Sequence, residues 1–542
     1  MDLRPASILR WLFDPAQGDR DRLLPRWLFL RALGLIYFSA FYSLLFQVRG
    51  LIGPNGILPA AEYLRAVTNS FGAARFWYAP TLLWFSASNH TLMAIAWAGL
   101  LASLFLTINI FPRGMLLICF IGFLSFVSAA SDFSGYQSDS MLLEAGFLSL
   151  FLAPPGFRRG LAPNSPPIRA SIFLLLWEWF RIYFESGIAK IASGDPQWRH
   201  FTAMDEYYQN GPLPTWIGWH VQHLPHWFHA ATAFGTLALE LVLVWMLFLP
   251  RRFRIICFFI VTPWQIGIIL TANYTFLNYL VLALGIFLLD DRFLAPFFAR
   301  FVPQSWRAHL PPSTQTVAEA PAAAETPAPH WQQTWARQLA AVKLALTSIM
   351  FLWLLYSSTV LLLLMIWRDA PFSYAPVAAL QPFRVADRYG LFAVMTRGRY
   401  EIEFQGSNDG ENWIAYPFRY KPQNPHEAPR IYAPYQPRFD WNLWFASLGH
   451  WRSNPIVPRA EERLLEGSPD VLALFAGNPF PQPPRQIRVL LWQYWFTPMQ
   501  EKREQGLWWR RQLLGNYAPT LARDANGRIV AIEWPPEPPP RQ

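Results

Sequence analysis

Long apolar segments recur along the first 290 residues of the chain and return once near residue 350. A membrane-spanning helix needs about 20 mostly apolar residues, and most of these segments reach or approach that length. The pattern therefore predicts a mostly α-helical polytopic membrane bundle with about nine spans. The predicted spans cover residues 27–48, 91–111, 114–131, 140–153, 168–191, 229–249, 254–273, 276–290 and 338–367.

The remaining stretches divide the chain into four parts. The helical bundle is expected over residues 1–300, followed over 301–336 by a flexible cytoplasmic linker that is rich in Pro and Ala. A last membrane helix over 337–368 leads to a soluble domain over 369–542. Alternating stretches such as RYEIEFQGS and RQIRVLLWQYWF predict β-sheet in that domain. Its aromatic clusters FDWNLWFASLG and WQYWF are expected in the core, on a docking surface against the membrane domain, or on a client-binding surface.

Charge gives the bundle an orientation. The net charge is +10, but much of the basic excess gathers in short loops and flanks such as RDRLLPRWLFLR, PGFRRG and PRRFR. Cytoplasmic loops of membrane proteins carry an excess of Lys and Arg, so the pattern predicts a cytoplasmic N-terminus rather than a nucleic-acid partner. With nine spans, the domain after about residue 368 lies outside the cytoplasm.

The sequence gives little support to metal, redox or nucleotide chemistry. The two cysteines lie inside apolar segments and lack the spacing of a metal or redox pair. His220, His223 and His226 recur every third residue, but Pro225 breaks the helical register, so we expect them at a cavity mouth rather than around a metal. P-loop, dinucleotide-binding and common hydrolase motifs are missing from the sequence. We therefore predict no metal and no cofactor.

One predicted span, SIFLLLWEWFRIYFESGIAKI, carries four charges. Glu178, Arg181 and Glu185 fall within about 60° on one helix face, whereas Lys190 lies about 120° from Glu178. Charges inside a bilayer must pair or face a polar cavity. Two interpretations follow. The charges form a buried salt-bridge network that fixes helix packing, or they line a functional cavity for a lipid, a quinone or proton transfer, with Lys190 as the base.

Two more acids extend this predicted intramembrane network. Glu144, in SDSMLLEAG, is expected opposite Arg181, and Glu240, in LALELVLVW, is a lone intramembrane acid that marks a paired or functional site. Lys190 is one of only four lysines among 45 basic residues, which makes it the candidate for chemistry. The predicted network comprises Glu144, Glu178, Arg181, Glu185 and Glu240.

Several long motifs, in order, resemble the lipase maturation factor family. They include QSDSMLLEAGFLSLFLAP, WEWFRIYFESGIAKIASGDPQWR, TAMDEYYQNGPLPTWIGWHVQHLPHWFH, DRYGLFAVMTRGRYEIEFQGSNDGENWIAYPFRYKP and NPFPQPPRQIRVLLWQYWFTP. The resemblance implies a multi-pass membrane protein with a large non-cytoplasmic domain that helps secreted lipases reach their active form. The preference for Arg over Lys is typical of a bacterial chain. We therefore expect the inner membrane, a periplasmic C-terminal domain, membrane lipids as surroundings, and exported clients such as lipases.

The stretch SGIAKI also resembles, more distantly, the membrane core of vitamin K-dependent carboxylases. In that family an aromatic-rich span ends in a Gly-hydrophobic-Lys-Lys motif, and here Ala189 takes the place of the first lysine and Lys190 that of the second. The resemblance implies an alternative function, an intramembrane enzyme that acts on a lipid or quinone with Lys190 as base.

Overall fold

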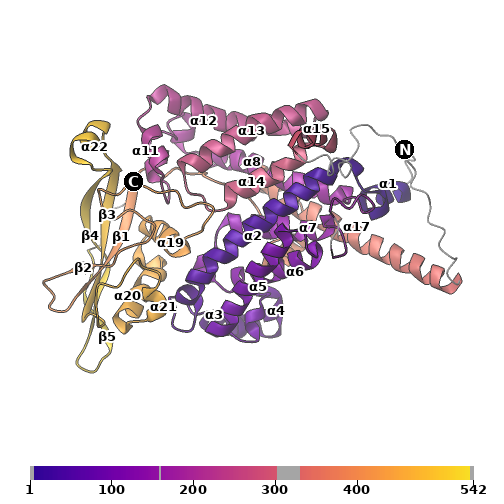
Figure 1. The fold of residues 1–542 in the computed structure, drawn as a ribbon. Coiled ribbons are helices and arrows are strands. Elements are labelled where there is room, and N and C mark those ends of the chain that lie inside the picture. Colours follow the sequence, from indigo (N-terminus) through magenta and orange to yellow (C-terminus); the bar gives the residue numbers. More distant parts are fainter. Residues whose placement is uncertain (1–4, 158–159, 302–329, 537–542) are drawn as a thin grey trace.

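The computed structural model describes residues 5–157, 160–301 and 330–536. Its helices gather into one block, and an antiparallel sheet stands at the end of the block away from the N-terminus (Figure 1). The predicted linker over 301–336 lies almost wholly outside the described residues.

Every apolar segment that was predicted as a span is helical. Proline stands at or just before the first residue of three of these helices, at Pro112, Pro225 and Pro250, where its missing N–H is not needed. The helices are α2 (Leu23–Ile52), α5 (Asn89–Thr107), α6 (Pro112–Val127), α7 (Gln137–Leu152), α8 (Arg169–Ala192), α12 (His226–Leu241) with a 3-10 turn (Leu243–Phe248), α13 (Arg251–Thr271), α14 (Leu277–Gly285) and α17 (His330–Ile366).

Five helices of the described chain are long and apolar enough to cross a membrane: α2, α5, α12 with its 3-10 turn, α13 and α17. Helices α6 and α14 are apolar but shorter, α7 has 16 residues, and α8 carries four charges near its C-terminal half. The mostly helical membrane bundle is thus confirmed, but nine crossings are not.

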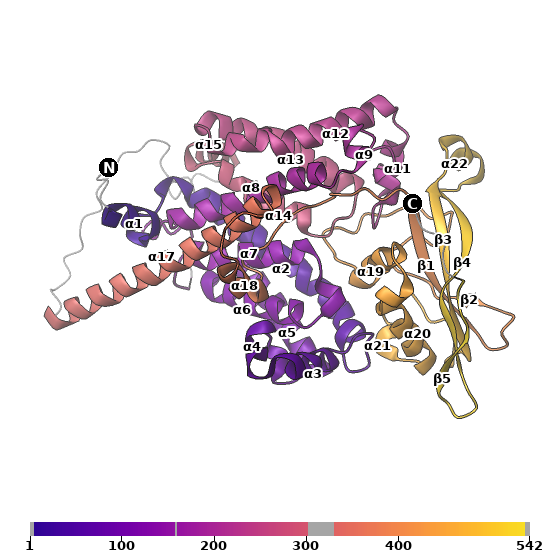
Figure 2. The same cartoon turned by 180° about the vertical axis from the view of Figure 1, so that it is seen from behind.

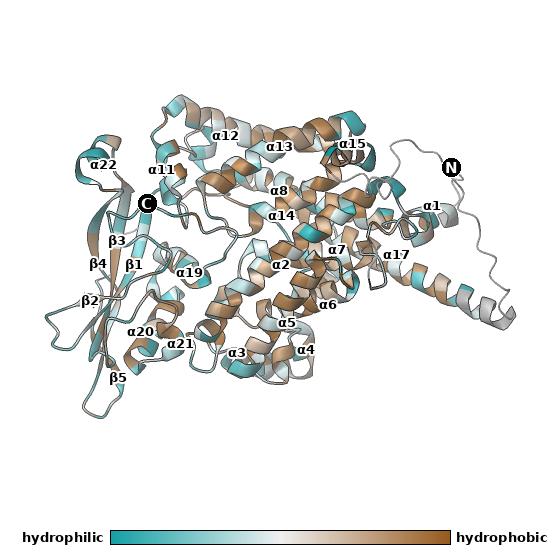
Figure 3. Ribbon diagram, in the orientation of Figure 1, coloured by the Kyte–Doolittle hydropathy of each residue, from teal (hydrophilic) through white to brown (hydrophobic). Residues whose placement is uncertain are grey.

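Shorter helices occupy the connections. They are α1 (Pro5–Phe13), α3 (Ala60–Phe71), α4 (Arg75–Tyr78), α9 (Pro196–Arg199), α10 (Tyr207–Asn210), α11 (Trp216–Gln222), α15 (Asp291–Phe301) and α18 (Ala375–Leu380). Figure 3 shows long apolar stretches along α2, α5, α12 and α13, whereas the sheet domain mixes polar and apolar residues.

The C-terminal domain is built on a five-stranded antiparallel sheet in the order β2-β1-β3-β4-β5. The strands are β1 (Arg399–Ser407), β2 (Ile414–Ala415), β3 (Gln486–Phe496), β4 (Trp509–Arg523) and β5 (Ile529–Glu533), and α22 (Met499–Gln505) joins β3 to β4. Helices α19 (Arg438–Ser447), α20 (Ile456–Glu466) and α21 (Pro469–Leu472) lie between the sheet and the bundle (Figures 1 and 2).

The aromatic clusters of this domain are mostly buried, either in its own core or against the membrane half. Phe439, Trp441 and Trp444 of α19 are each at most 7% exposed. Tyr494 and Phe496 of β3 are likewise buried. Trp441, Tyr494 and Phe496 pack with buried residues of the membrane half, so the structure favours core packing and docking over a client-binding surface.

Buried polar contacts attach the C-terminal domain to the bundle. Arg438 of α19 donates two hydrogen bonds to Asp139 of α7, at 2.7 and 2.8 Å, and both side chains are fully buried. Asn273, after α13, accepts the amides of Tyr432 (2.6 Å) and Ala433 (3.0 Å). Buried hydrogen bonds thus connect the C-terminal domain to the helical bundle.

The Arg438–Asp139 pair gives a first test of this attachment. Arg438→Met leaves the Asp139 carboxylate buried without its partner, which should destabilise the protein by about 3–5 kcal/mol. Adding Asp139→Leu should restore most of the loss, because an apolar pair can replace a buried ion pair. The measurement is the midpoint of thermal unfolding of the detergent-purified full chain.

Arg459→Gln is the matched control, since Arg459 pairs with Glu62 and Glu462 at an exposed site. It should change the stability by less than about 1 kcal/mol. Equal losses for Arg438→Met and Arg459→Gln would contradict the assigned role of the buried pair.

Candidate functional site

Helix α8 lies inside the bundle and contacts α7, α12, α14 and α17. Glu178, Arg181 and Glu185 are fully buried and Lys190 is 2% exposed. Buried charges are stable only when they are paired or hydrogen-bonded. The partners of these four side chains therefore indicate what the helix does.

Most of the partners lie in a segment from the C-terminal half of the chain. Residues 387–395, here called the docked segment, follow the last membrane helix and form neither helix nor strand. The amide and carbonyl groups of such a segment have no regular partners of their own, so burying them requires hydrogen bonds from elsewhere. Polar side chains of the bundle supply these bonds.

Arg181 is at the centre of the contact. Its guanidinium bonds to Glu144 of α7 and donates to the carbonyl of Asp387 (2.7 Å). Glu185 lies 3.8 Å from the same guanidinium and accepts the backbone amide of Tyr389 (2.5 Å). The Tyr389 hydroxyl donates to Glu144 (2.6 Å), which closes the network between α7, α8 and the docked segment.

Uncharged and acidic side chains hold the rest of the docked segment. The amides of Gly390, Leu391 and Met395 donate to side-chain oxygens of Gln137 (3.0 Å), Ser186 (3.2 Å) and Asp195 (2.7 Å), and the Trp198 indole donates to the Phe392 carbonyl (3.0 Å). The sequence does not identify these residues, because a polar side chain about 200 positions from the segment that it binds leaves no pattern in the local sequence. These contacts thereby fix the start of the C-terminal domain against the helical bundle.

Lys190 stands apart from the Arg181 network. Its ammonium donates to Glu240 of α12 and to the carbonyl of Leu391, both at 2.9 Å. Helices α8 and α12 approach closely here because Gly187 has no side chain; a Cβ at that position would lie 2.8 Å from Leu241. Lys190 and the lone acid Glu240 therefore pair with each other. Lys190 also bonds to the docked segment, and both side chains line a cavity that lies beside it.

Glu178 does not join Arg181 and Glu185 in the buried salt-bridge network that the sequence predicts. No described residue donates a hydrogen bond to either of its carboxylate oxygens, although the side chain is fully buried. Arg181 turns toward Glu144 and the docked segment instead. The acid that pairs with Arg181 is therefore Glu144 of α7, not Glu178, which lies one turn earlier in α8.

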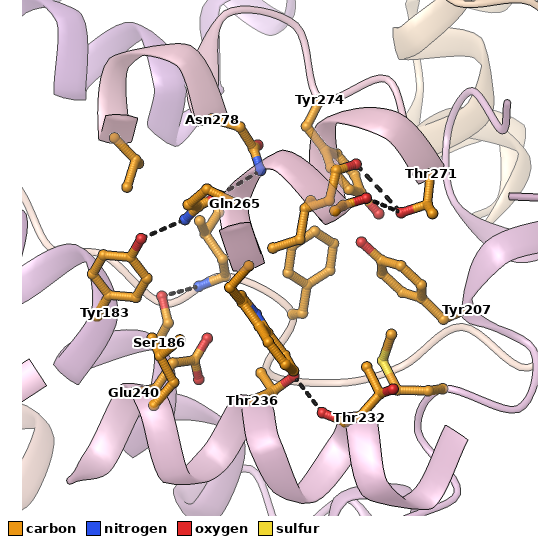
Figure 4. A pocket seen from close by; sticks show the side chains of 18 of the residues that line it. Tyr183, Ser186, Tyr207, Thr232, Thr236, Glu240, Gln265, Thr271, Tyr274 and Asn278 are labelled. Carbon is orange, nitrogen blue, oxygen red and sulfur yellow. Dashed lines mark hydrogen bonds between the residues drawn. The ribbon is translucent and has the colours of Figure 1, made fainter. Parts of the chain in front are cut away.

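A cavity of about 570 Å³ lies beside Lys190, between α8, α12, α13 and α14 (Figure 4). Most of its walls are aromatic or aliphatic, and Lys190 and Glu240 form part of its lining. Elsewhere in the lining, Gln265 donates to the Tyr183 hydroxyl (2.6 Å), and Asn278 donates to Gln265 (2.8 Å). The cavity thus combines a large apolar wall with a few placed polar groups, as small-molecule sites do.

The three histidines predicted at a cavity mouth lie beside the cavity and not in its lining. His223 bonds to the Thr497 carbonyl (2.9 Å) of the C-terminal domain, His226 bonds to Asp205 (2.9 Å), and His220 stacks edge-on against a neighbouring tryptophan. Within the described ranges, no group of three or more His, Cys, Asp or Glu is placed to hold a metal ion.

The two acids on either side of Arg181 should respond differently to neutralisation. Glu144→Gln removes the charge that pairs with Arg181 and should destabilise the protein by about 3–5 kcal/mol. Glu178→Gln removes no hydrogen bond and removes an acid that is buried without a hydrogen-bond donor, so it should not destabilise the protein. Thermal unfolding of the purified chain measures both. A loss at Glu178 as large as that at Glu144 would contradict the network described above.

Comparison with known proteins agrees with this two-part structure. Residues 24–296 match the lipase maturation factor transmembrane domain, and residues 385–519 match the lipase maturation factor C-terminal domain. The second match begins just before the docked segment. The carboxylase resemblance of SGIAKI gains no support from these matches, and no solved structure is similar enough to match the chain.

Curated relatives extend the match over nearly the whole chain. Lipase maturation factor 1 from Bos taurus is 32% identical, with 95% of this chain and 92% of the relative covered. Lipase maturation factor 2 from Homo sapiens is 30% identical, with 92% and 83% covered, and that from Gallus gallus is 30% identical, with 92% and 81% covered. On both the domain matches and these relatives, the chain belongs to the lipase maturation factor family.

Proposed function

We propose that this membrane protein assists the folding or assembly of exported lipases, as the names of its relatives indicate for them. The observation that carries the proposal is the fixed placement of the C-terminal domain on the bundle. The docked segment and the Arg438–Asp139 pair hold the two matched domains together. A domain held in this way offers clients a rigid surface at one end of the bundle.

The open edge of β4 is the proposed client surface. Strand β5 pairs only with residues 520–523 of β4, so β4 has no strand partner on that side over 510–519 in the described chain. Five consecutive residues, Arg510–Leu514, are exposed, and Leu513 and Leu514 are 47% and 45% exposed. Unpaired strand edges with apolar side chains accept an extended segment of another chain by β-addition.

Orientation follows from the positions of the arginines. Arg22 donates to the Phe287 carbonyl (2.8 Å), and Arg292 lies 3.1 Å from Asp21. These contacts lie at the end of the bundle near α1 and α15, away from the sheet (Figure 1). Because basic residues concentrate on the cytoplasmic side, we place the N-terminus in the cytoplasm and the sheet domain outside it. For a bacterial chain this means the inner membrane and the periplasm.

Deleting the gene in the source organism tests the function. Secreted lipases should lose specific activity, measured as hydrolysis of a triacylglycerol per mass of secreted enzyme, and a plasmid copy of the wild-type chain should restore it. Lipases secreted with normal yield and specific activity in the deleted strain would refute the proposed function.

Variants of the plasmid copy test the surface separately. Leu513→Lys combined with Leu514→Lys should abolish most of the restoration, because charged edge residues oppose strand addition. Ile414→Lys is the matched control, since Ile414 is 50% exposed on the opposite edge strand, β2, and it should restore activity fully. If wild type and the double variant restore activity equally, the function stands and the β4 surface is refuted.

A further inference from the structure

The cavity beside Lys190 is bounded on its outer side by the two helices most open to the bilayer. The hydrophobic windows of α12 and α13 are only 28% and 17% buried within the protein. Outward side chains here are apolar and between 55% and 64% exposed: Phe234 of α12, Val242 directly after α12, and Phe259 of α13. A ligand that passes between these helices therefore comes from the membrane interior.

Gly267 of α13 belongs to the cavity lining and is itself exposed, and no atom lies within 4 Å of where its Cβ would stand. From this free space we infer that the cavity opens toward the bilayer at Gly267. Behind it the wall is formed by apolar side chains, including Leu239, Trp264, Leu277 and Val281. Such a wall suits a hydrocarbon chain, which keeps apolar surroundings when it moves there from the bilayer.

The polar side chains of the lining carry no net charge and include oxygen atoms that accept no hydrogen bond from the described residues. Lys190 and Glu240 neutralise each other through Glu240 Oε1. Glu240 Oε2 is buried and receives no hydrogen bond from any described residue, and the same is true of Asn278 Oδ1. Both side chains line the cavity (Figure 4). A buried acceptor without a donor is unfavourable, so a ligand that brings a donor gains binding energy here.

These observations select a ligand class. A hydroxyl group can donate to the free oxygen of Glu240, whereas a phosphate would bring negative charge against that carboxylate. We propose that the cavity binds an uncharged lipid with a free hydroxyl group, of the acylglycerol type, that enters from the bilayer past Gly267. This inference does not depend on the client of the C-terminal domain.

Two photoactivatable lipids that differ only in the head group test the proposal. The full-length chain is reconstituted in phosphatidylcholine nanodiscs with a trace of a diacylglycerol or a phosphatidic acid, each with a diazirine in one acyl chain. After illumination, labelled peptides are quantified by mass spectrometry. Diacylglycerol should label peptides around Leu239, Trp264 and Val281 about tenfold more than phosphatidic acid does.

Two substitutions on neighbouring positions of α13 separate the cavity from the lipid-facing surface. Gly267→Phe fills the opening and should lower diacylglycerol labelling of these peptides about tenfold. Ile266→Phe, at a side chain that is 44% exposed and outside the lining, should leave the labelling unchanged. Thermal unfolding confirms that both variants are folded.

Glu240→Gln checks the head-group argument independently, because it leaves Lys190 as a net positive charge and should shift the labelling toward phosphatidic acid. Equal labelling by the two probes in the wild type, or unchanged labelling in Gly267→Phe, would overturn the proposal and leave a cavity that holds only water.

Discussion

Attachment of the docked segment to the helical bundle is the constraint on which the rest of the structure depends. Residues 387–395 have no regular secondary structure, so each buried amide and carbonyl needs a partner from another element. Arg181, Glu185 and Ser186 of α8 provide such partners, and Glu144 of α7 neutralises Arg181. The irregular chain that they hold therefore explains Arg181, Glu185 and Lys190 of α8, whereas Glu178 makes no hydrogen bond to it.

This arrangement joins the two halves of the protein near the cavity. Lys190 bonds to Leu391 of the docked segment and to Glu240 of α12, so it belongs both to the attachment and to the cavity lining. Beyond the docked segment, α19–α21 separate the sheet from the bundle and leave β4 facing outward (Figure 2). A change that releases the docked segment would disturb the placement of the sheet domain and the shape of the cavity together.

The sequence predicts the helices well and their partners poorly. An apolar pattern depends only on nearby residues, and all nine segments that it predicts are helical. Whether a helix crosses the bilayer also depends on its length and charge. Helix α7 is short and α8 is charged, so a count of apolar segments does not give the number of crossings. The sequence predicts the pairing of Glu144 with Arg181, because one is an acid, the other is a base, and both lie inside apolar segments. It does not predict the Lys190–Glu240 pair, because helical geometry relates Lys190 only to its own helix. The docked segment carries no periodic signal at all, and its role depends on contacts with residues about 200 positions away.

Hydrogen–deuterium exchange at the docked segment tests the account most directly. The amides of Tyr389, Gly390 and Leu391 donate to side chains of the bundle, so in the purified full chain they should exchange as slowly as amides within α8. The amides of Glu411 and Asn412 also donate to a side chain, that of Asp409, but they lie in an exposed turn after β1 and therefore provide the reference for side-chain-bonded amides at the surface. Exchange at 389–391 as fast as at this turn would show that α8 does not hold the segment, and would contradict the account.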